Sequence, residues 1–443
     1  MEMTPKQIVA YLDDYVIGQK DAKKAIALAL RNRYRRMQLD KELQDEIMPK
    51  NILMIGNTGV GKTEIARRLA KMMELPFVKV EASKYTEVGY VGRDVESMVR
   101  DLVANAVRIS REKYEKKIQK DIDKEIVKKV VEILVPKLPT NATQSAQESF
   151  IKTYNTMEKK VLNGSMDDKF ITIKLPKNTH VEVFDSGAPM ADISIMTDAI
   201  GNMIKNAKNN TYDKTVTIKE AKKLLKKVVK EELVDEELIT KDAISNVENG
   251  GIIFLDEIDK IVESGSNKGQ DPSKQGVQRD LLPIVEGSSI STKYGQVNTD
   301  HVLFIAAGAF HISSPSDMLP ELQGRFPLRV ELEALDESAL YKILTNTKNS
   351  LLTQYEAMLG VEGVKLVFED GAIKAFASLS AKANEKTEDI GARRLHTVIE
   401  KVLEDISFDA DEKNGETIKI DKKLVEQKLQ AIIESEDITR YIL

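Results

Sequence analysis

The residues best suited to chemistry lie close together near the start of the chain. Gly56, Gly61, Lys62 and Thr63 have the spacing G-x-x-x-x-G-K-[ST]. Glycines let backbone N–H groups approach phosphate oxygens, the lysine reaches the β- and γ-phosphates, and the threonine hydroxyl can bind Mg²⁺. The ordinary alternative is a glycine-rich turn with a capping threonine. An apolar run before the motif and a helical pattern after it favour binding of ATP or GTP.

A second candidate is the acid pair that ends the apolar run "IIFLDEIDK". Asp256 can hold Mg²⁺ through water, while Glu257 can orient or deprotonate an attacking water. Two acids can also simply end a strand at its solvated edge, and for an isolated pair that interpretation is the better one. Together with a phosphate loop, the pair predicts nucleotide hydrolysis.

Phosphoryl transfer also requires a cation for the charge that develops on the γ-phosphate, and a neighbouring subunit often supplies it. Arg325 lies in "ELQGRFP", which predicts a rigid exposed corner. Arg393 and Arg394 lie in "IGARRLHTVIE", at the start of a predicted helix. Taken singly, each arginine is more often part of a surface ion pair than a catalytic group. All three stay candidates.

These residues need a scaffold of alternating strands and helices. Apolar runs begin at Asn51 and cover 250–261 and 301–310, and helical patterns separate them. This alternation predicts an α/β fold with a doubly wound core, in which ligands collect at the carboxyl ends of the strands.

The pattern of apolar and charged residues changes at two points after this core begins. Between about Arg111 and Asp242 charged helical stretches replace the buried strands, which predicts a mostly helical inserted domain. After Pro327 the chain becomes helical, apart from a strand-like stretch at 416–420. We therefore expect three domains: a discontinuous core at 1–110 and 243–330, an insertion at 111–242, and a mostly α C-terminal domain at 331–443.

The insertion should contain a pair of helical arms. One arm spaces apolar residues four apart at Tyr114, Ile118, Ile122 and Ile126, and the other repeats them at Ala221, Leu224, Leu225 and Val228. The second arm also carries Lys222, Lys223, Lys226 and Lys227. A solvated helix face explains these lysines better than a polyanion site does.

Composition excludes several function classes. The chain has 443 residues, 42% of them hydrophobic, which is enough for about three domains with real cores. Its formal net charge is −5, so no overall basic field attracts nucleic acid or an anionic membrane. With no cysteine and four histidines, disulfides and a zinc site are not expected. No stretch has the length of a membrane span, and the N-terminus does not read as a signal peptide, so we expect a cytoplasmic protein.

The motifs together resemble the AAA+ ATPases of the Clp/Hsp100 group, and more narrowly the HslU family, the ClpX-related ATPase subunits of the bacterial HslUV protease. The resemblance covers nearly the whole chain. It rests on "VIGQ" (16–19), "GNTGVGKTE" (56–64), "EVGYVGRDVES" (87–97), "FLDEIDK" (254–260), "GVQRDLLPIVEG" (276–287), "PSDMLPELQGRFP" (315–327), "IGARRLHTV" (390–398) and the terminal "RYIL".

The resemblance implies a P-loop AAA+ core, the cofactors ATP and Mg²⁺, and a homohexameric ring. In this family Ile17 would line the adenine pocket. Asp256 and Thr63 would bind the magnesium ion, and Glu257 would activate the attacking water. Glu321 and Arg325 would approach ATP from the adjacent subunit, and Arg393 would be a sensor of the nucleotide. The phosphate loop would comprise Gly59, Val60, Gly61, Lys62, Thr63 and Glu64. A first sensor stays unassigned, because the expected position reads Ala306, Ala307 and Gly308.

Two further segments gain roles from the resemblance. "GYVG" would be a pore loop comprising Gly89, Tyr90, Val91 and Gly92, in which the aromatic grips unfolded polypeptide and the glycines allow movement. The alternative is a glycine-bounded surface turn. The last residues, Ile442 and Leu443, would dock into an HslV-type peptidase ring, whereas a frayed terminus is the ordinary interpretation.

The expected function is therefore an ATP-dependent unfoldase ring that threads unfolded or tagged proteins into a partner peptidase and stimulates it. The chain has none of the nucleophile patterns of a peptidase, so proteolysis is expected elsewhere. Three alternatives stay open: a ClpX-type unfoldase for another peptidase, a nucleic-acid remodelling ring, and a nucleotide-gated scaffold. Acidic net charge and an aromatic pore loop argue against nucleic acid as a partner.

Overall fold

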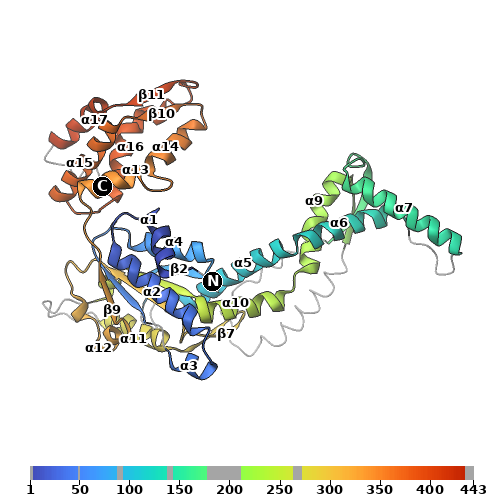
Figure 1. Ribbon diagram of the computed structural model, residues 1–443, viewed down its shortest axis with the longest axis horizontal. Coiled ribbons are helices and arrows are strands. Elements are labelled where there is room, and N and C mark those ends of the chain that lie inside the picture. The colour runs from blue at the N-terminus through green and yellow to red at the C-terminus, as the bar shows by residue number, and fades with distance from the viewer. Residues whose placement is uncertain are drawn as a thin grey trace. The chain divides into compact units, whose positions relative to one another are not determined.

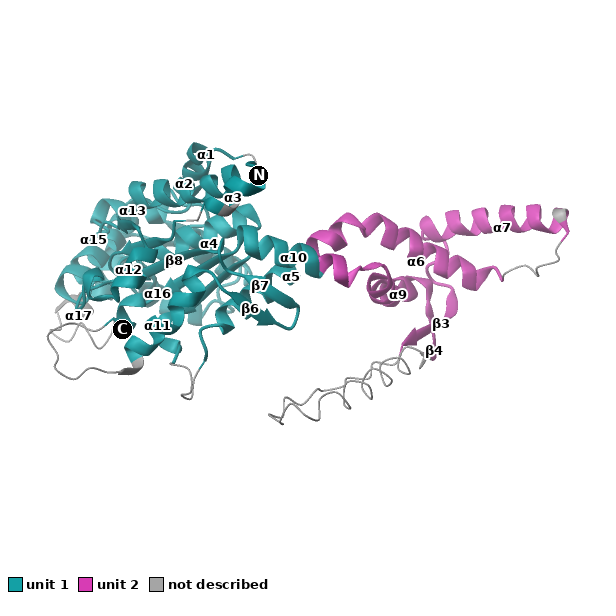
Figure 2. Ribbon diagram, turned by 90° about the horizontal axis from the view of Figure 1, so that it is seen from below, with its two compact units in different colours: residues 1–109, 240–443 teal, residues 110–239 magenta. Residues whose placement is uncertain are grey.

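The structure is a computed structural model that describes residues 3–47, 50–86, 93–136, 143–176, 211–262 and 272–434. These residues form two compact units, coloured separately in Figure 2. One unit comprises 1–109 together with 240–443, and the other comprises 110–239. The second unit begins one residue before the insertion expected at 111–242 and ends three residues before it.

The first unit is built on a parallel sheet, of which β2 and β9 are labelled in Figure 1. Within the described residues the strand order is β2-β5-β8-β1-β9, and every neighbouring pair is parallel. The expected strands at 51, 250 and 301 are the three central ones, which confirms the predicted α/β class. The strands are β1 (Ile52–Ile55), β2 (Phe77–Glu81), β5 (Ile252–Asp256), β8 (Leu303–Gly308) and β9 (Leu328–Glu331).

Both faces of this sheet are buried, as the continuous apolar runs predict. One face, with Met54, Phe254 and Ile305, shares a core with α1 (Pro5–Asp13), α2 (Lys20–Arg36) and α4 (Lys62–Met73). On the other face, Ile253 and Phe304 are also fully buried. The sheet is therefore a rigid platform for the loops at its carboxyl edge.

Further elements complete the core region. The helices are α3 (Lys41–Glu46), the first part of α5 (Ser97–Lys117), the last part of α10 (Glu236–Gly250), α11 (Pro272–Glu286) and α12 (Pro320–Arg325). A hairpin pairs β6 (Ser289–Thr292) with β7 (Gly295–Asn298).

The C-terminal part has its own hydrophobic core around Phe376. Its helices are α13 (Glu337–Thr345), α14 (Leu351–Gly360), α15 (Asp370–Lys386), α16 (Arg393–Phe408) and α17 (Lys422–Glu434). A parallel pair joins β10 (Lys365–Phe368) to β11 (Thr417–Ile420). The strand expected at 416–420 and the helix expected at Arg393 are both present.

The second unit contains the expected helical pair. Helix α6 (Gln119–Leu134) packs on α9 (Ile218–Leu233), and their buried residues form one core with α7 (Gln144–Leu162) and the hairpin β3–β4 (Phe170–Pro176 and Thr211–Thr217). Of the four lysines predicted to form a solvated face on α9, Lys223, Lys226 and Lys227 are exposed. Lys222 instead pairs with Asp167 at 2.7 Å and donates to the Val161 carbonyl.

Candidate active site

The phosphate loop joins β1 to α4, and its backbone and lysine are arranged around the helix start. Lys62 is the first residue of α4, and its Nζ donates to the carbonyl oxygens of Gly56 and, at 2.9 Å, Asn57. Burial lowers the pKa of Lys62, and the nearby carboxylates of Asp256 and Asp259 oppose that shift. The ammonium group is thus held inside the loop, where incoming phosphate oxygens would meet it.

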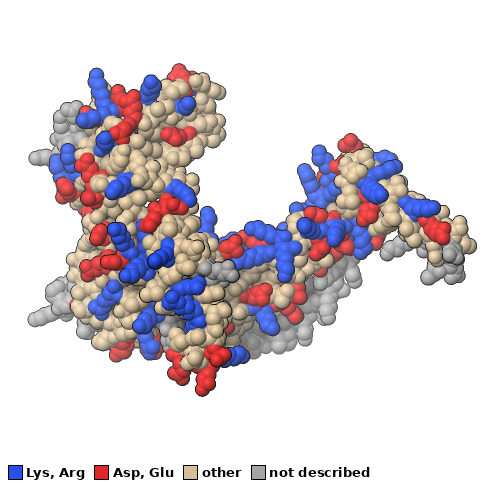
Figure 3. All heavy atoms as spheres, viewed as in Figure 1, with Lys and Arg blue, Asp and Glu red and all other residues tan. Residues whose placement is uncertain are grey.

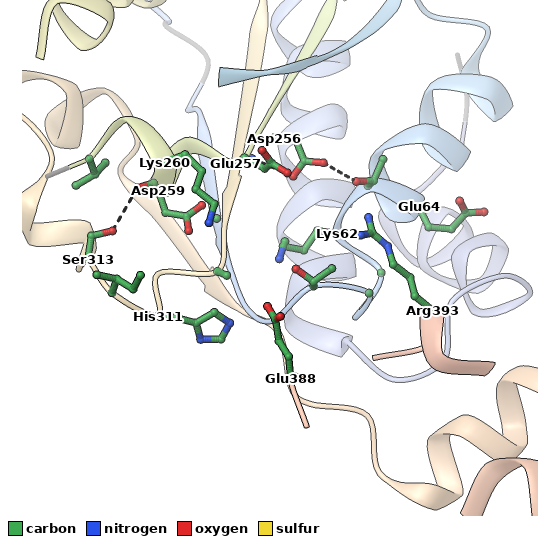
Figure 4. A pocket seen from close by; sticks show the side chains of 18 of the residues that line it. Lys62, Glu64, Asp256, Glu257, Asp259, Lys260, His311, Ser313, Glu388 and Arg393 are labelled. Atoms are coloured by element: carbon green, nitrogen blue, oxygen red, sulfur yellow. Dashed lines mark hydrogen bonds between the residues drawn. The ribbon is translucent and has the colours of Figure 1, made fainter. Parts of the chain in front are cut away.

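The two predicted magnesium residues meet at the end of β5. The Thr63 hydroxyl donates to Asp256 Oδ2 at 3.3 Å, which joins the first turn of α4 to the strand end (Figure 4). Lys79 on β2 forms an ion pair with the same carboxylate oxygen at 2.8 Å. β2 is the neighbour of β5 in the sheet, and this pairing places Lys79 beside Asp256. No sequence motif predicted this contact.

Glu257 stands in an unusual backbone conformation directly after this strand. Its φ of 56° lies in the left-handed region, which a residue with a side chain seldom adopts. Its side chain is exposed and accepts a hydrogen bond from the Ser83 hydroxyl at 3.3 Å. Strained residues of this kind are frequent at active sites, where the backbone sets the direction of a functional side chain.

Lys62, Thr63, Asp256 and Glu257 line one cavity of about 810 Å³, a size that suits a nucleotide. Figure 4 shows Lys62, Asp256 and Glu257 on one side of it and Arg393 and Glu388 on the other. Its lining comes from five segments of the chain: Thr58, Gly59, Gly61, Lys62, Thr63 and Glu64; Asp256, Glu257, Asp259, Lys260 and Val262; Lys274 on α11; Gly308, Ala309, His311, Ile312 and Ser313; and Glu388 and Arg393.

The loop after β8 adds polar side chains that the sequence analysis did not single out. Asp259 accepts from the Phe310 amide at 3.3 Å, and its carbonyl accepts from the Ser313 hydroxyl at 3.4 Å. These bonds fix the loop, and His311 and Ser313 line the cavity. The strand residues Ala306, Ala307 and Gly308, at the position expected for a first sensor, carry no polar side chain.

The side chains of Arg393 and Arg394, at the start of α16, differ in their exposure and contacts. Arg393 is exposed and lines the cavity. Arg394 is 3% exposed and donates to the Asn384 side chain at 3.2 Å, to the Thr387 hydroxyl at 2.8 Å and to the Glu388 carbonyl at 2.9 Å. Of the two, Arg393 can act on a nucleotide, and Arg394 braces the loop that presents it.

Three other predicted residues flank the phosphate loop, and of these Val60 and Ile17 do not line the cavity. Val60 is buried in the core beneath the loop. Ile17 is half-buried beside Val16, which faces Gly61. Burial raises the pKa of the Glu64 carboxyl, but hydrogen bonds from Arg67 and Arg68 outweigh it and leave that pKa below its ordinary value. Glu64 lines the cavity while its carboxylate is held by two arginines.

Glu321 and Arg325 are exposed residues of α12 and do not line the cavity of their own chain. Arg325 forms an ion pair with Glu286 at 3.0 Å. Its carbonyl accepts from the buried Asn51 side chain at 3.1 Å, and Asn51 also accepts from the Phe304 amide, so the sheet fixes this corner.

Gln19, at the end of "VIGQ", was not given a role from sequence. Its amide donates to the Glu333 carbonyl at 2.8 Å and to the Val60 carbonyl at 3.4 Å, and its oxygen accepts from the Glu333 amide at 3.0 Å. One buried side chain thus links the phosphate loop to the segment that leads into the C-terminal part.

Two of the predicted sites lie outside the described residues. These are the pore loop with Gly89, Tyr90, Val91 and Gly92, and the terminal Ile442 and Leu443.

The described surface in Figure 3 mixes acidic and basic side chains over both units, in keeping with the slightly negative net charge. Among the described helices, none combines the length and the apolar character needed to span a bilayer.

Comparisons with known proteins agree with this geometry. Residues 52–136 match the model of the "ATPase family associated with various cellular activities (AAA)", and residues 181–329 match the "AAA domain (Cdc48 subfamily)". The chain is 56% identical over 445 residues to the "ATP-dependent protease ATPase subunit HslU" of Campylobacter jejuni subsp. jejuni strain 81-176, covering all of both chains. It is 54% identical over 444 residues to the protein of the same name from Helicobacter pylori strain G27, covering 100% of this chain and 99% of that one. The chain therefore belongs to the HslU family of AAA ATPases.

Proposed function

We propose that this chain is the motor of a two-component protease: a hexameric, Mg²⁺-dependent ATPase that unfolds proteins and threads them into an HslV-type peptidase ring. The observation that carries the proposal is the meeting of Lys62, Thr63, Asp256, Glu257 and Arg393 at one cavity, in a chain of the HslU family.

Each side chain has a role that its position supports. Lys62 would bind the β- and γ-phosphates, and Glu257 would orient and deprotonate the attacking water. Thr63 and Asp256 offer hard oxygen donors 3.3 Å apart, the kind of ligand that Mg²⁺ prefers. A Mg²⁺ ion held there would neutralise charge on the phosphate oxygens. Arg393 would read the terminal phosphate from the C-terminal side.

Hydrolysis would be completed by a neighbouring subunit. Arg325 is exposed, fixed at a corner by Asn51, and away from the cavity of its own chain, which suits a cation offered to the next subunit. Glu321 lies on the same short helix. Because two neighbouring subunits would share each site, ATP hydrolysis in one subunit would depend on the position of the next. Movement of the pore loop around Tyr90 would then pull on the substrate. Ile442 and Leu443 would dock on the peptidase.

The test is a mixing experiment with two inactive variants. Glu257→Gln and Arg325→Ala should each bind ATP, and each should lower kcat by roughly 10³-fold. In rings mixed at random from equal amounts, about a quarter of the interfaces would join an intact Glu257 to an intact Arg325. ATPase activity should therefore return on mixing.

Arg329→Ala is the matched control, because Arg329 is an exposed arginine on the adjacent strand that contacts Gln323 at 3.2 Å. It should keep full activity alone. If mixing restores no activity above the separate variants, the two residues do not share a site, and the ring mechanism is wrong.

A further inference from the structure

The phosphate loop is in direct contact with the loop that precedes α16. The Ala392 amide donates to the Gly59 carbonyl at 3.2 Å. The backbones approach so closely that a Cβ on Gly59 would lie 2.0 Å from the Ile390 carbonyl oxygen. These two loops carry the phosphate-binding groups and Arg393, so their separation determines how the arginine meets a nucleotide.

One side-chain bond reinforces this contact. Asn57 Nδ2 donates to Asp389 Oδ2 at 2.7 Å, and the other oxygen of the same carboxylate accepts from the Gly391 amide at 2.9 Å. Asp389 therefore holds the phosphate loop with one oxygen and shapes its own loop with the other. Both side chains are half-buried, so water competes only partly for the bond.

The Asp389 loop is itself rigid on the C-terminal side. The Asn384 side chain donates to the Gly391 carbonyl at 3.1 Å, and Arg394 donates to the Glu388 carbonyl at 2.9 Å. A loop braced in this way transmits a pull at Asp389 to Arg393, four residues later, instead of absorbing it.

We infer that Asn57 and Asp389 form a positioning latch that holds Arg393 at the height of the terminal phosphate, and so sets the preference for ATP over ADP. The inference rests on the proposed role of Arg393. Neither latch residue contacts the reacting atoms. ADP lacks the terminal phosphate, so loosening the latch should weaken binding of ATP more than binding of ADP.

The test measures dissociation constants of the full chain for adenylyl imidodiphosphate, as the ATP analogue, and for ADP. Asn57→Asp sets two carboxylates against each other and should weaken the ATP analogue about 30-fold and ADP less than about 3-fold. Asp389→Asn keeps an amide-to-amide bond and should cost less than about 5-fold. The double variant exchanges donor and acceptor and should restore the analogue to within about 5-fold of the parent.

Two controls separate the latch from other effects. Asp370→Asn makes the same acid-to-amide change on α15, where Asp370 accepts from the Tyr341 hydroxyl at 2.6 Å, and should leave both constants unchanged. Arg393→Ala should itself weaken the analogue more than ADP. The latch is refuted if Arg393→Ala shows this preference but the latch variants weaken binding of both nucleotides equally. It is also refuted if the loss of analogue affinity in the double variant equals the product of the losses in the two single variants. If Arg393→Ala shows no preference, the role proposed for Arg393 fails, and the latch fails with it.

Discussion

Gly391→Ala tests the close approach between the phosphate loop and the C-terminal part. Gly391 has a φ of 57°, and an added Cβ would lie 2.8 Å from the Thr58 carbonyl oxygen and from the Gly59 carbonyl. Those atoms are backbone and cannot turn aside. To reach an ordinary contact of 3.4 Å, the two loops would have to separate by about 0.6 Å.

That shift has a cost that can be worked out. It would lengthen the 3.2 Å bond between Ala392 and Gly59 beyond hydrogen-bonding range, a loss of about 1 kcal/mol. The left-handed conformation adds about 1–2 kcal/mol for a residue with a Cβ. Relative to an open arrangement in which the Gly391 backbone relaxes, the closed arrangement loses about 2–3 kcal/mol, which corresponds to roughly 30- to 150-fold weaker ATP binding if binding requires the closed arrangement.

Nucleotide titration of the full chain measures this effect, and Gly415→Ala is its control. Gly415 has a φ of 85° in the same C-terminal part, with nothing within 4 Å of an added Cβ. It carries the backbone strain without the clash, so it should lower thermal stability and keep ATP affinity. ATP binding by Gly391→Ala that matches Gly415→Ala would show that the two loops need not touch.

Two other predictions follow from contacts in the cavity. Lys79→Met removes the ion pair to Asp256, so Mg²⁺ no longer competes with an ammonium group for that carboxylate. When ATPase activity is titrated with Mg²⁺, the variant should reach half-maximal activity at a lower Mg²⁺ concentration. An unchanged or higher midpoint would contradict this. Glu64→Gln removes a carboxylate whose pKa is lowered in the folded chain by Arg67 and Arg68, against the effect of burial. Such a group stabilises the fold above its unfolded pKa of about 4.3, and the contribution is lost as pH falls through the lower folded value. Glu64→Gln should therefore melt below wild type at neutral pH, with a gap that closes in acid; a gap that is constant with pH would refute the coupling.

The central part of the fold could be read from the sequence because burial there is uniform. β1, β5 and β8 are covered on both faces, and their continuous apolar runs made them visible. β2 and β9 were missed because they form the two edges of the sheet. "FVKVE" and "LRVE" bury only part of their residues, so charged and apolar positions mix and no clear period remains.

The site divides in the same way. Lys62, Thr63, Asp256 and Glu257 belong to local motifs whose spacing carries their chemistry. Lys79 contacts Asp256, Asp389 contacts Asn57, and His311 lines the cavity. Each is a single residue whose neighbours are far away in sequence, so no motif spacing could predict its place in the site. They became visible only when the sheet order and the loop contacts were known.

The composition of the cavity also has a consequence for biosynthesis. Lys62 is made early, whereas Glu388 and Arg393 are translated more than 300 residues later and depend on a core that closes around Phe376. A nascent chain on the ribosome thus carries a phosphate loop long before it has a complete pocket. We therefore expect full nucleotide affinity only after residues 388–393 have been synthesised and folded.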